Sequence, residues 1–185
     1  MTVGILALQG DFAMHQRLLN NLGHSTRLVR YPDDLTECDR LIIPGGESTN
    51  LSLQLDSSGL RSPLLEFARS HSIFGTCAGL IMLATAVGHP KVSPLGLMPM
   101  TVDRNGWGRQ VNSFIAEIDL EFSKDQPFKG TFIRAPKISK HNPDLRILGR
   151  YQTEPVLITD NHHLAAAFHP ELEHDSRIHE FFLSL

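Results

Sequence analysis

Short, uninterrupted apolar runs recur through the first half of this chain, separated by turns and helical stretches. The runs cover residues 2–8, 25–30, 41–43 and 72–74. Such runs are typical of strands buried on both faces, as in a parallel sheet covered by helices. Helices are predicted over residues 12–22 and 78–87. Another helix is predicted to begin with Ser62 as its cap and Pro63 at its first helical position. We therefore predict an α/β fold, a three-layer sandwich around a central, mostly parallel sheet.

The second half of the chain is predicted to hold further short strands, after a loop over residues 88–100. These strands cover residues 111–118, 131–133, 145–151, 156–159 and 164–168. A last helix is predicted to begin after a cap at Asp175 and to run to about Phe182. The sequence has no internal repeat or linker-like segment, and its 185 residues suit one folding unit. We therefore predict a single domain over residues 1–185.

Composition argues against several classes of function. Lys and Arg number 17 against 20 Asp and Glu, and the net charge of −3 predicts no surface for nucleic acid or acidic lipid. No apolar run approaches the roughly 18 residues of a membrane span, and no basic segment typical of a signal peptide opens the chain. Two cysteines are too few for a disulfide scaffold. We predict a cytoplasmic protein with free thiols, in which Cys38 serves packing.

Cys77 lies between the fourth apolar run and the helix after it, with Gly75 and Gly79 two residues away on either side. This arrangement is typical of a nucleophile elbow, a strained turn that lifts a nucleophile above a parallel sheet. The glycines allow strand and helix to pack closely, and the helix N-terminus favours a thiolate and a developing oxyanion. A lone cysteine in an apolar segment also fits core packing or redox sensing. The turn alone leaves these alternatives open.

Residues 44–49, Pro-Gly-Gly-Glu-Ser-Thr, follow the third apolar run directly. Two adjacent glycines at the carboxyl end of a parallel strand can turn the backbone sharply and expose its amides, where ligands bind in open α/β sheets. An ordinary strand-to-helix turn capped by Ser48 or Thr49 fits the same residues. The Gly-Lys-Ser/Thr ending of a phosphate-binding loop is absent, so phosphate binding is not predicted.

His169 and Glu171 stand two residues apart just after the last apolar run, on either side of Pro170. Positions i and i+2 of an extended chain point to the same side, and the proline favours extended geometry at His169. The glutamate could therefore orient the imidazole, which is what a cysteine nucleophile needs from its base. The crowded C-terminal histidines also allow a metal site, but they lack zinc-motif spacing, and His162-His163 is predicted to lie in a solvated turn.

Three of these motifs resemble the class I glutamine amidotransferases: Gly-Thr-Cys-Ala-Gly at 75–79, the 44–49 loop, and Phe-His-Pro-Glu at 168–171. Within that class, three more blocks resemble the PdxT family of glutaminase subunits of pyridoxal 5′-phosphate synthase. They are Leu-Ala-Leu-Gln-Gly at 6–10, Asp-Arg-Asn at 103–105 with Gly-Arg-Gln at 108–110, and Phe-Ile-Arg-Ala-Pro at 132–136. The resemblance runs from residue 3 to the C-terminal helix and implies a flavodoxin-like sheet. Gly106-Trp107 departs from it, because the family usually has alanine and a smaller aromatic residue there.

The resemblance also implies roles for individual residues. Cys77 matches the nucleophile, and His169 with Glu171 completes a catalytic triad. The amides of Gly46 and Ala78 match the oxyanion hole. The residues that match glutamine contacts are Gly46, Glu47, Ser48, Arg104, Ile133 and Arg134. A substrate with an α-carboxylate and an α-ammonium group calls for one cationic and one anionic partner among them.

By this resemblance the chain hydrolyses L-glutamine to L-glutamate and ammonia, without a cofactor or metal. The ammonia would pass to a synthase subunit of the PdxS type in a large hetero-oligomer that builds pyridoxal 5′-phosphate. Rival interpretations are a glutaminase serving another synthase, a cysteine peptidase, and a non-catalytic redox or stress sensor that uses Cys77. A sensor does not require the His169-Pro-Glu171 pair, whereas acyl transfer does.

Overall fold

The computed structural model describes residues 1–107 and 113–185. Within these residues, nine strands form the main sheet in the order β2-β1-β3-β4-β12-β11-β10-β7-β8. The first five of these are β2 (Ser25–Val29), β1 (Thr2–Leu6), β3 (Arg40–Ile43), β4 (Ser72–Thr76) and β12 (Leu164–Ala166). They pair in parallel, as predicted from their apolar runs. Their side chains form the centre of the core, with Ile5, Leu41, Ile42 and Phe74 fully buried.

The remaining four strands continue the sheet by antiparallel pairing. They are β11 (Glu154–Thr159), β10 (Arg146–Tyr151), β7 (Ser113–Leu120) and β8 (Ser123–Ile133). The strands predicted over 145–151 and 156–159 are β10 and β11, which pair as an antiparallel hairpin. The short run predicted at 131–133 is only the end of β8, whose earlier, polar part pairs with β7 at the edge of the sheet. Residues 111 and 112 of the predicted strand over 111–118 lie outside the described residues.

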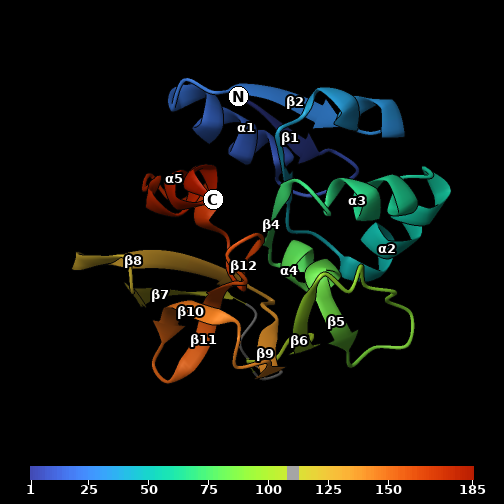
Figure 1. Ribbon diagram of the computed structural model, residues 1–185. Helices are drawn as coiled ribbons and strands as arrows, with labels where there is room; N and C mark the ends of the chain where they lie inside the picture. Colours follow the sequence, from blue (N-terminus) through green and yellow to red (C-terminus); the bar gives the residue numbers. More distant parts are fainter. Residues whose placement is uncertain (108–112) are drawn as a thin grey trace.

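Helices lie on both faces of the parallel strands, which confirms the three-layer sandwich (Figure 1). One side carries α1 (Phe12–Asn21) and α5 (Arg177–Ser184). The other side carries α2 (Ser48–Ser57), α3 (Arg61–Phe67) and α4 (Ala78–Leu83). The predicted cap of α5 at Asp175 is wrong by one residue, because Ser176 is the N-cap; the Asp175 carboxylate still accepts a hydrogen bond from the Arg177 amide at 3.1 Å. Among the described helices, none has the length and apolar character to cross a membrane.

Two predicted helix boundaries are wrong. The helix after Cys77 ends at Leu83, and the residues predicted to extend it to Val87 form β5 (Ala84–Val87). That strand joins a second, three-stranded sheet with β6 (Met98–Asp103) and β9 (Lys137–His141), so its backbone finds partners that helical periodicity alone does not reveal. Likewise α3 begins at Arg61 without a side-chain cap, and Pro63 takes its third position rather than its first.

Candidate active site

Cys77 occupies the tight turn between β4 and α4. Its backbone has φ 50° and ψ −103°, in the left-handed half of conformational space that a residue with a Cβ adopts only under constraint. Hydrogen bonding from the Cys77 amide to Ala166 O, at 2.8 Å, supplies part of that constraint. A Cβ at Gly75 would collide with the backbone of Gly79, and one at Gly79 would collide with Ile43 O. The turn is therefore strained and depends on both flanking glycines, as predicted.

Strand register brings the other predicted loops to this turn. Thr76 pairs with Ala166 on one side of β4, and Gly75 pairs with Ile43 on the other. The chain that leaves β12 and the Pro-Gly-Gly loop that leaves β3 therefore both end next to Cys77. Room is scarce at this point, because a Cβ at Gly45 would collide with the His169 ring and lie 3.3 Å from the Cys77 Cβ. Gly45 thus lets the loop pass close to both side chains.

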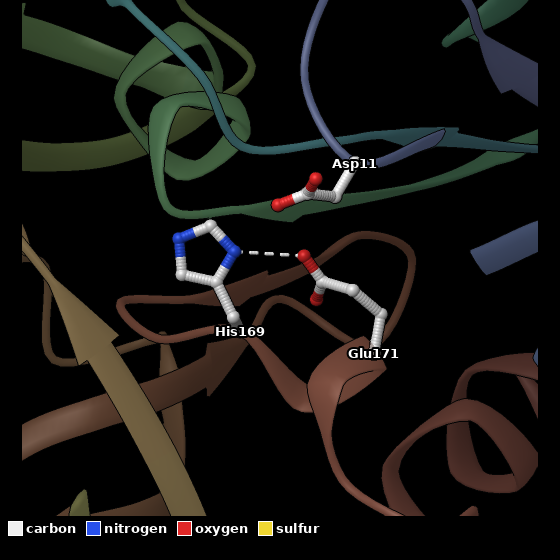
Figure 2. Close-up of side chains that lie close together, drawn as sticks. All are labelled: Asp11, His169 and Glu171. Atoms are coloured by element: carbon white, nitrogen blue, oxygen red, sulfur yellow. Dashed lines mark hydrogen bonds and ion pairs between the residues drawn. The ribbon is translucent and has the colours of Figure 1, made fainter. Parts of the chain in front are cut away.

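His169 and Glu171 lie side by side beyond β12. His169 comes just before the short 3-10 helix η2 (Pro170–Leu172), and Glu171 lies within it. The Nδ1 atom of His169 is 2.8 Å from Oε1 of Glu171, the contact drawn in Figure 2. A carboxylate only accepts hydrogen bonds, so this nitrogen carries the proton and donates it. The amide of His169 is held in turn by Thr131 O at 2.9 Å. The other ring nitrogen of His169, Nε2, is therefore available to interact with Cys77.

Burial and charge pairing set the protonation of this group. Burial lowers the pKa of His169, but hydrogen bonds to Cys77 and Glu171 outweigh it and raise this pKa to about 10. Burial raises the pKa of Glu171, but His15 and His169 reverse the effect and hold it below its ordinary value. The arrangement favours an imidazolium flanked by a carboxylate and a cysteine sulfur at neutral pH. That charge distribution suits a cysteine used as a nucleophile.

A cavity of about 340 Å³ opens above these side chains. Every predicted site residue lines it except Ala78, at the start of α4, and Glu171, which lies behind His169. The lining residues that were predicted are Gly46, Glu47, Ser48, Cys77, Arg104, Ile133, Arg134 and His169. A larger cavity of about 480 Å³ lies over β7, β8 and β10 and contains none of them, so chemistry rather than size identifies the candidate site.

Glu47 and Arg104 form a charged pair at the rim of this cavity. Arg104 Nη2 lies 2.7 Å from Glu47 Oε1, and its Nη1 donates to Thr49 Oγ1 at 3.0 Å. The Glu47 carboxylate also accepts from the amides of Thr49 and Asn50, which makes Glu47, not Ser48 or Thr49, the cap of α2. Burial raises the pKa of Glu47, but the amide bonds and Arg104 lower it overall. The site therefore offers one anion and one cation held in fixed positions.

The Gly106-Trp107 departure has a structural explanation. A Cβ at Gly106 would collide with Lys137, so the close approach of β9 requires glycine there. Trp107 donates its indole N–H to Pro136 O at 3.1 Å and packs on Phe114, Phe132 and Tyr151. The pair anchors the loop that carries Arg104 to the β7–β8 region. The matched block at 108–110 lies outside the described residues.

Three residues near the site were missed by sequence reasoning. Asp11 lines the cavity and faces His169 and Glu171 in Figure 2; the three place ligand-type atoms within 4.8 Å of one another. Its position directly after the turn that leaves β1 was the available signal. His15 of α1 and His179 of α5 are fully buried behind Glu171. Nothing in their sequence neighbourhood distinguishes them from surface histidines.

Two predictions about other residues have different outcomes. Cys38 is a buried free thiol packed in the core, which confirms the packing role. His162-His163 does not form a solvated turn, so that prediction is wrong. His163 is 4% exposed, and its Nδ1 accepts a hydrogen bond from the Ile73 amide at 3.1 Å, while His162 contacts Ala68 O. These contacts tie the start of β12 to the start of β4.

Comparisons with known proteins agree with this geometry. Residues 5–185 match the model of the SNO glutamine amidotransferase family. The chain is 46% identical to the pyridoxal 5′-phosphate synthase subunit PdxT of Deinococcus radiodurans, over 100% of this chain and 97% of that protein. It is 42% identical to the same subunit of Desulforudis audaxviator, over 99% and 97%. A crystal structure of a glutamine amidotransferase superposes with a TM-score of 0.92 at 39% identity, over 98% of this chain and 97% of that one.

Proposed function

This chain belongs to the SNO glutamine amidotransferase family, and we propose that it is the glutaminase subunit of a pyridoxal 5′-phosphate synthase. It hydrolyses L-glutamine to L-glutamate and ammonia. The observation that carries the proposal is the strained Cys77 turn with the His169–Glu171 pair beside it, inside a match that spans nearly the whole chain. A redox sensor would need the cysteine but not this oriented imidazole.

Each residue of the site has a defined task in this reaction. The Cys77 sulfur attacks the side-chain amide carbon of glutamine and forms a glutamyl thioester. His169 donates its proton to the departing ammonia, then accepts one from the water that hydrolyses the thioester. Glu171 holds Nδ1–H and stabilises the imidazolium. The amides of Gly46 and Ala78 stabilise the oxyanion. Glu47, Ser48, Arg104, Ile133 and Arg134 orient the substrate.

Coupling to a synthase subunit is the second part of the proposal. We propose that residues 1–185 form one amidotransferase domain, which works in the cytoplasm in a large hetero-oligomer with a PdxS-type subunit. Gly46 has φ +140°, a conformation that only glycine adopts easily, so its peptide is able to reorient. The Gln9 side chain packs against Gly46, and its amide donates to Glu47 O at 2.7 Å. Gln9 thus links the β1 turn to the oxyanion loop.

The decisive experiment measures glutamine hydrolysis by the isolated chain and during titration with the cognate synthase subunit. We expect slow hydrolysis alone and a rise of about 10²–10³-fold in kcat with partner, the usual effect of gaining one oxyanion donor. Gln9→Ala is expected to weaken that rise. Full activity without partner would end the coupling proposal but keep the glutaminase. Absence of hydrolysis in both states would refute the glutaminase itself.

Removing Arg104 tests the substrate contacts. An Arg104→Ala variant loses the cation that pairs with Glu47, and losing one partner of a charged hydrogen bond costs about 2–5 kcal/mol. The Glu47 side chain is 52% exposed, so solvent screening favours the lower end, roughly a 30-fold loss in kcat/KM. We expect the loss mainly in KM, measured by steady-state glutamine kinetics. Arg146→Ala, which breaks the remote ion pair with Glu121, is the matched control. Unchanged kinetics in Arg104→Ala would contradict a substrate role.

A further inference from the structure

Glu171 has a second carboxylate oxygen that the His169 pair does not use. This oxygen, Oε2, is fully buried and has no hydrogen-bond partner among the described residues. The atom that faces it is His15 Nε2, at 3.4 Å, from helix α1. The same nitrogen is 3.4 Å from Thr76 Oγ1, one residue before Cys77. His15 therefore lies between the carboxylate and the elbow, and it touches both.

A second histidine stands behind the first. His15 Nδ1 is 3.0 Å from His179 Nε2 of helix α5, and both side chains are fully buried. Burial lowers the pKa of both rings, that of His179 to about 3, so both are neutral at pH 7. The groups that face this pair are Glu171 and His169 from the segment after β12, Asp11 before α1, and Thr76 from β4.

Neutrality fixes the tautomers along this chain of contacts. An unprotonated His15 Nε2 would turn its lone pair toward the Glu171 carboxylate 3.4 Å away and be repelled by it, so we place the proton on Nε2, which makes Nδ1 an acceptor. His179 consequently donates from its own Nε2. That leaves His179 Nδ1 without a proton, and this atom has no hydrogen-bond partner among the described residues. Two polar rings buried at an apolar helix interface lose their hydration, which an aliphatic side chain would avoid, so packing alone does not account for them.

We propose that His15 is a positioning residue for Glu171, and that His179 sets the His15 tautomer. This inference rests on the proposed glutaminase function. The His15 N–H attracts the buried Oε2 from 3.4 Å away, so that Oε1 stays directed at His169. Catalytic hydrogen bonds are often long in a ligand-free site and shorten when charge develops, which fits the 3.4 Å contact. The relay connects α1 and α5 to the reacting group.

Kinetics of His15→Leu, measured with the synthase subunit present, test the proposal. We expect kcat to fall about 10- to 100-fold with KM nearly unchanged, as for a small misplacement of a catalytic group. The acidic limb of kcat/KM should move to higher pH, because a carboxylate without this donor takes up a proton more readily. His15→Gln, whose amide N–H can reach Oε2, should recover most of the loss. A normal pH profile in His15→Leu would overturn the proposal.

The control is the removal of a buried histidine that has no contact with Glu171. His163 is buried where β4 and β12 begin, whereas the candidate active site lies where these strands end. His163→Leu should therefore lower the unfolding temperature while leaving kcat and the pH profile unchanged. An equal kinetic loss in His163→Leu would refute a specific role for His15.

Nitrogen NMR of the wild-type imidazoles gives a readout that does not depend on glutamine turnover. Protonated Nε2 on His15 is expected, and protonated Nδ1 would overturn the inference even if glutaminase activity is found.

Discussion

Replacing Cys77 by alanine is expected to abolish ammonia release from glutamine, whereas replacing Cys38 is expected to leave it nearly unchanged. Cys77 lines the cavity beside His169, so its sulfur can reach a bound amide. Burial raises the pKa of Cys38 to about 11, which keeps that thiol protonated at neutral pH. Removing the nucleophile of a triad enzyme typically costs roughly 10⁶-fold in kcat. Ammonia release by both variants, assayed with the synthase subunit, measures the difference.

Covalent labelling supplies the control for that result. An electrophilic glutamine analogue should modify a peptide that contains Cys77, and glutamine should protect it. Cys38→Ala should label as the unchanged chain does, because both cysteines are free but only Cys77 faces the cavity. Modification on Cys38, or substantial turnover by Cys77→Ala, would show that the nucleophile is another group.

Much of the parallel half could be predicted from sequence because its strands are buried on both faces. The runs at 2–8 and 41–43 carry that signal directly, and the glycines around Cys77 predict the strained turn that the structure contains. The strands of the antiparallel half could not be predicted as accurately. Most of β8 is polar, since it lies at the edge of the sheet, and β5 becomes a strand by pairing with β6, the next strand along the chain, which its own apolar residues do not reveal.

The candidate site shows the same division between local and distant information. Cys77, His169 and Glu47 stand at strand ends, where sequence patterns place ligand-binding residues. The apolar residues Met14, Leu18, Leu19 and Leu22 recur at helical spacing in α1, yet the side chains that the helix buries are His15 and Leu19. A histidine in that stripe is explained only by contacts with Glu171 and His179, both more than 150 residues away along the chain.

Mutation of the triad should give losses that do not add. His169→Asn alone is expected to cost about as much in kcat as the double variant with Cys77→Ala, because each change removes the same step, attack by an activated sulfur. In the proposed mechanism Glu171 acts on Cys77 through His169, which bonds to Glu171 at 2.8 Å and lines the same cavity as Cys77. Single-turnover assays of the two single variants and the double variant measure the coupling. Additive losses would mean that the residues act independently.

The Glu171→Gln variant is expected to show an intermediate loss in kcat. Gln can still accept from Nδ1–H but lacks the charge, so kcat should fall less than in His169→Asn yet still by a large factor. Glu171 is one of the groups that raise the pKa of His169 to about 10, so removing its charge must lower that pKa. The imidazolium is then lost at lower pH, and the basic limb of kcat/KM should move toward neutrality. A basic limb that stays in place, with near-normal turnover in His169→Asn, would contradict a triad in which Glu171 acts on Cys77 through His169.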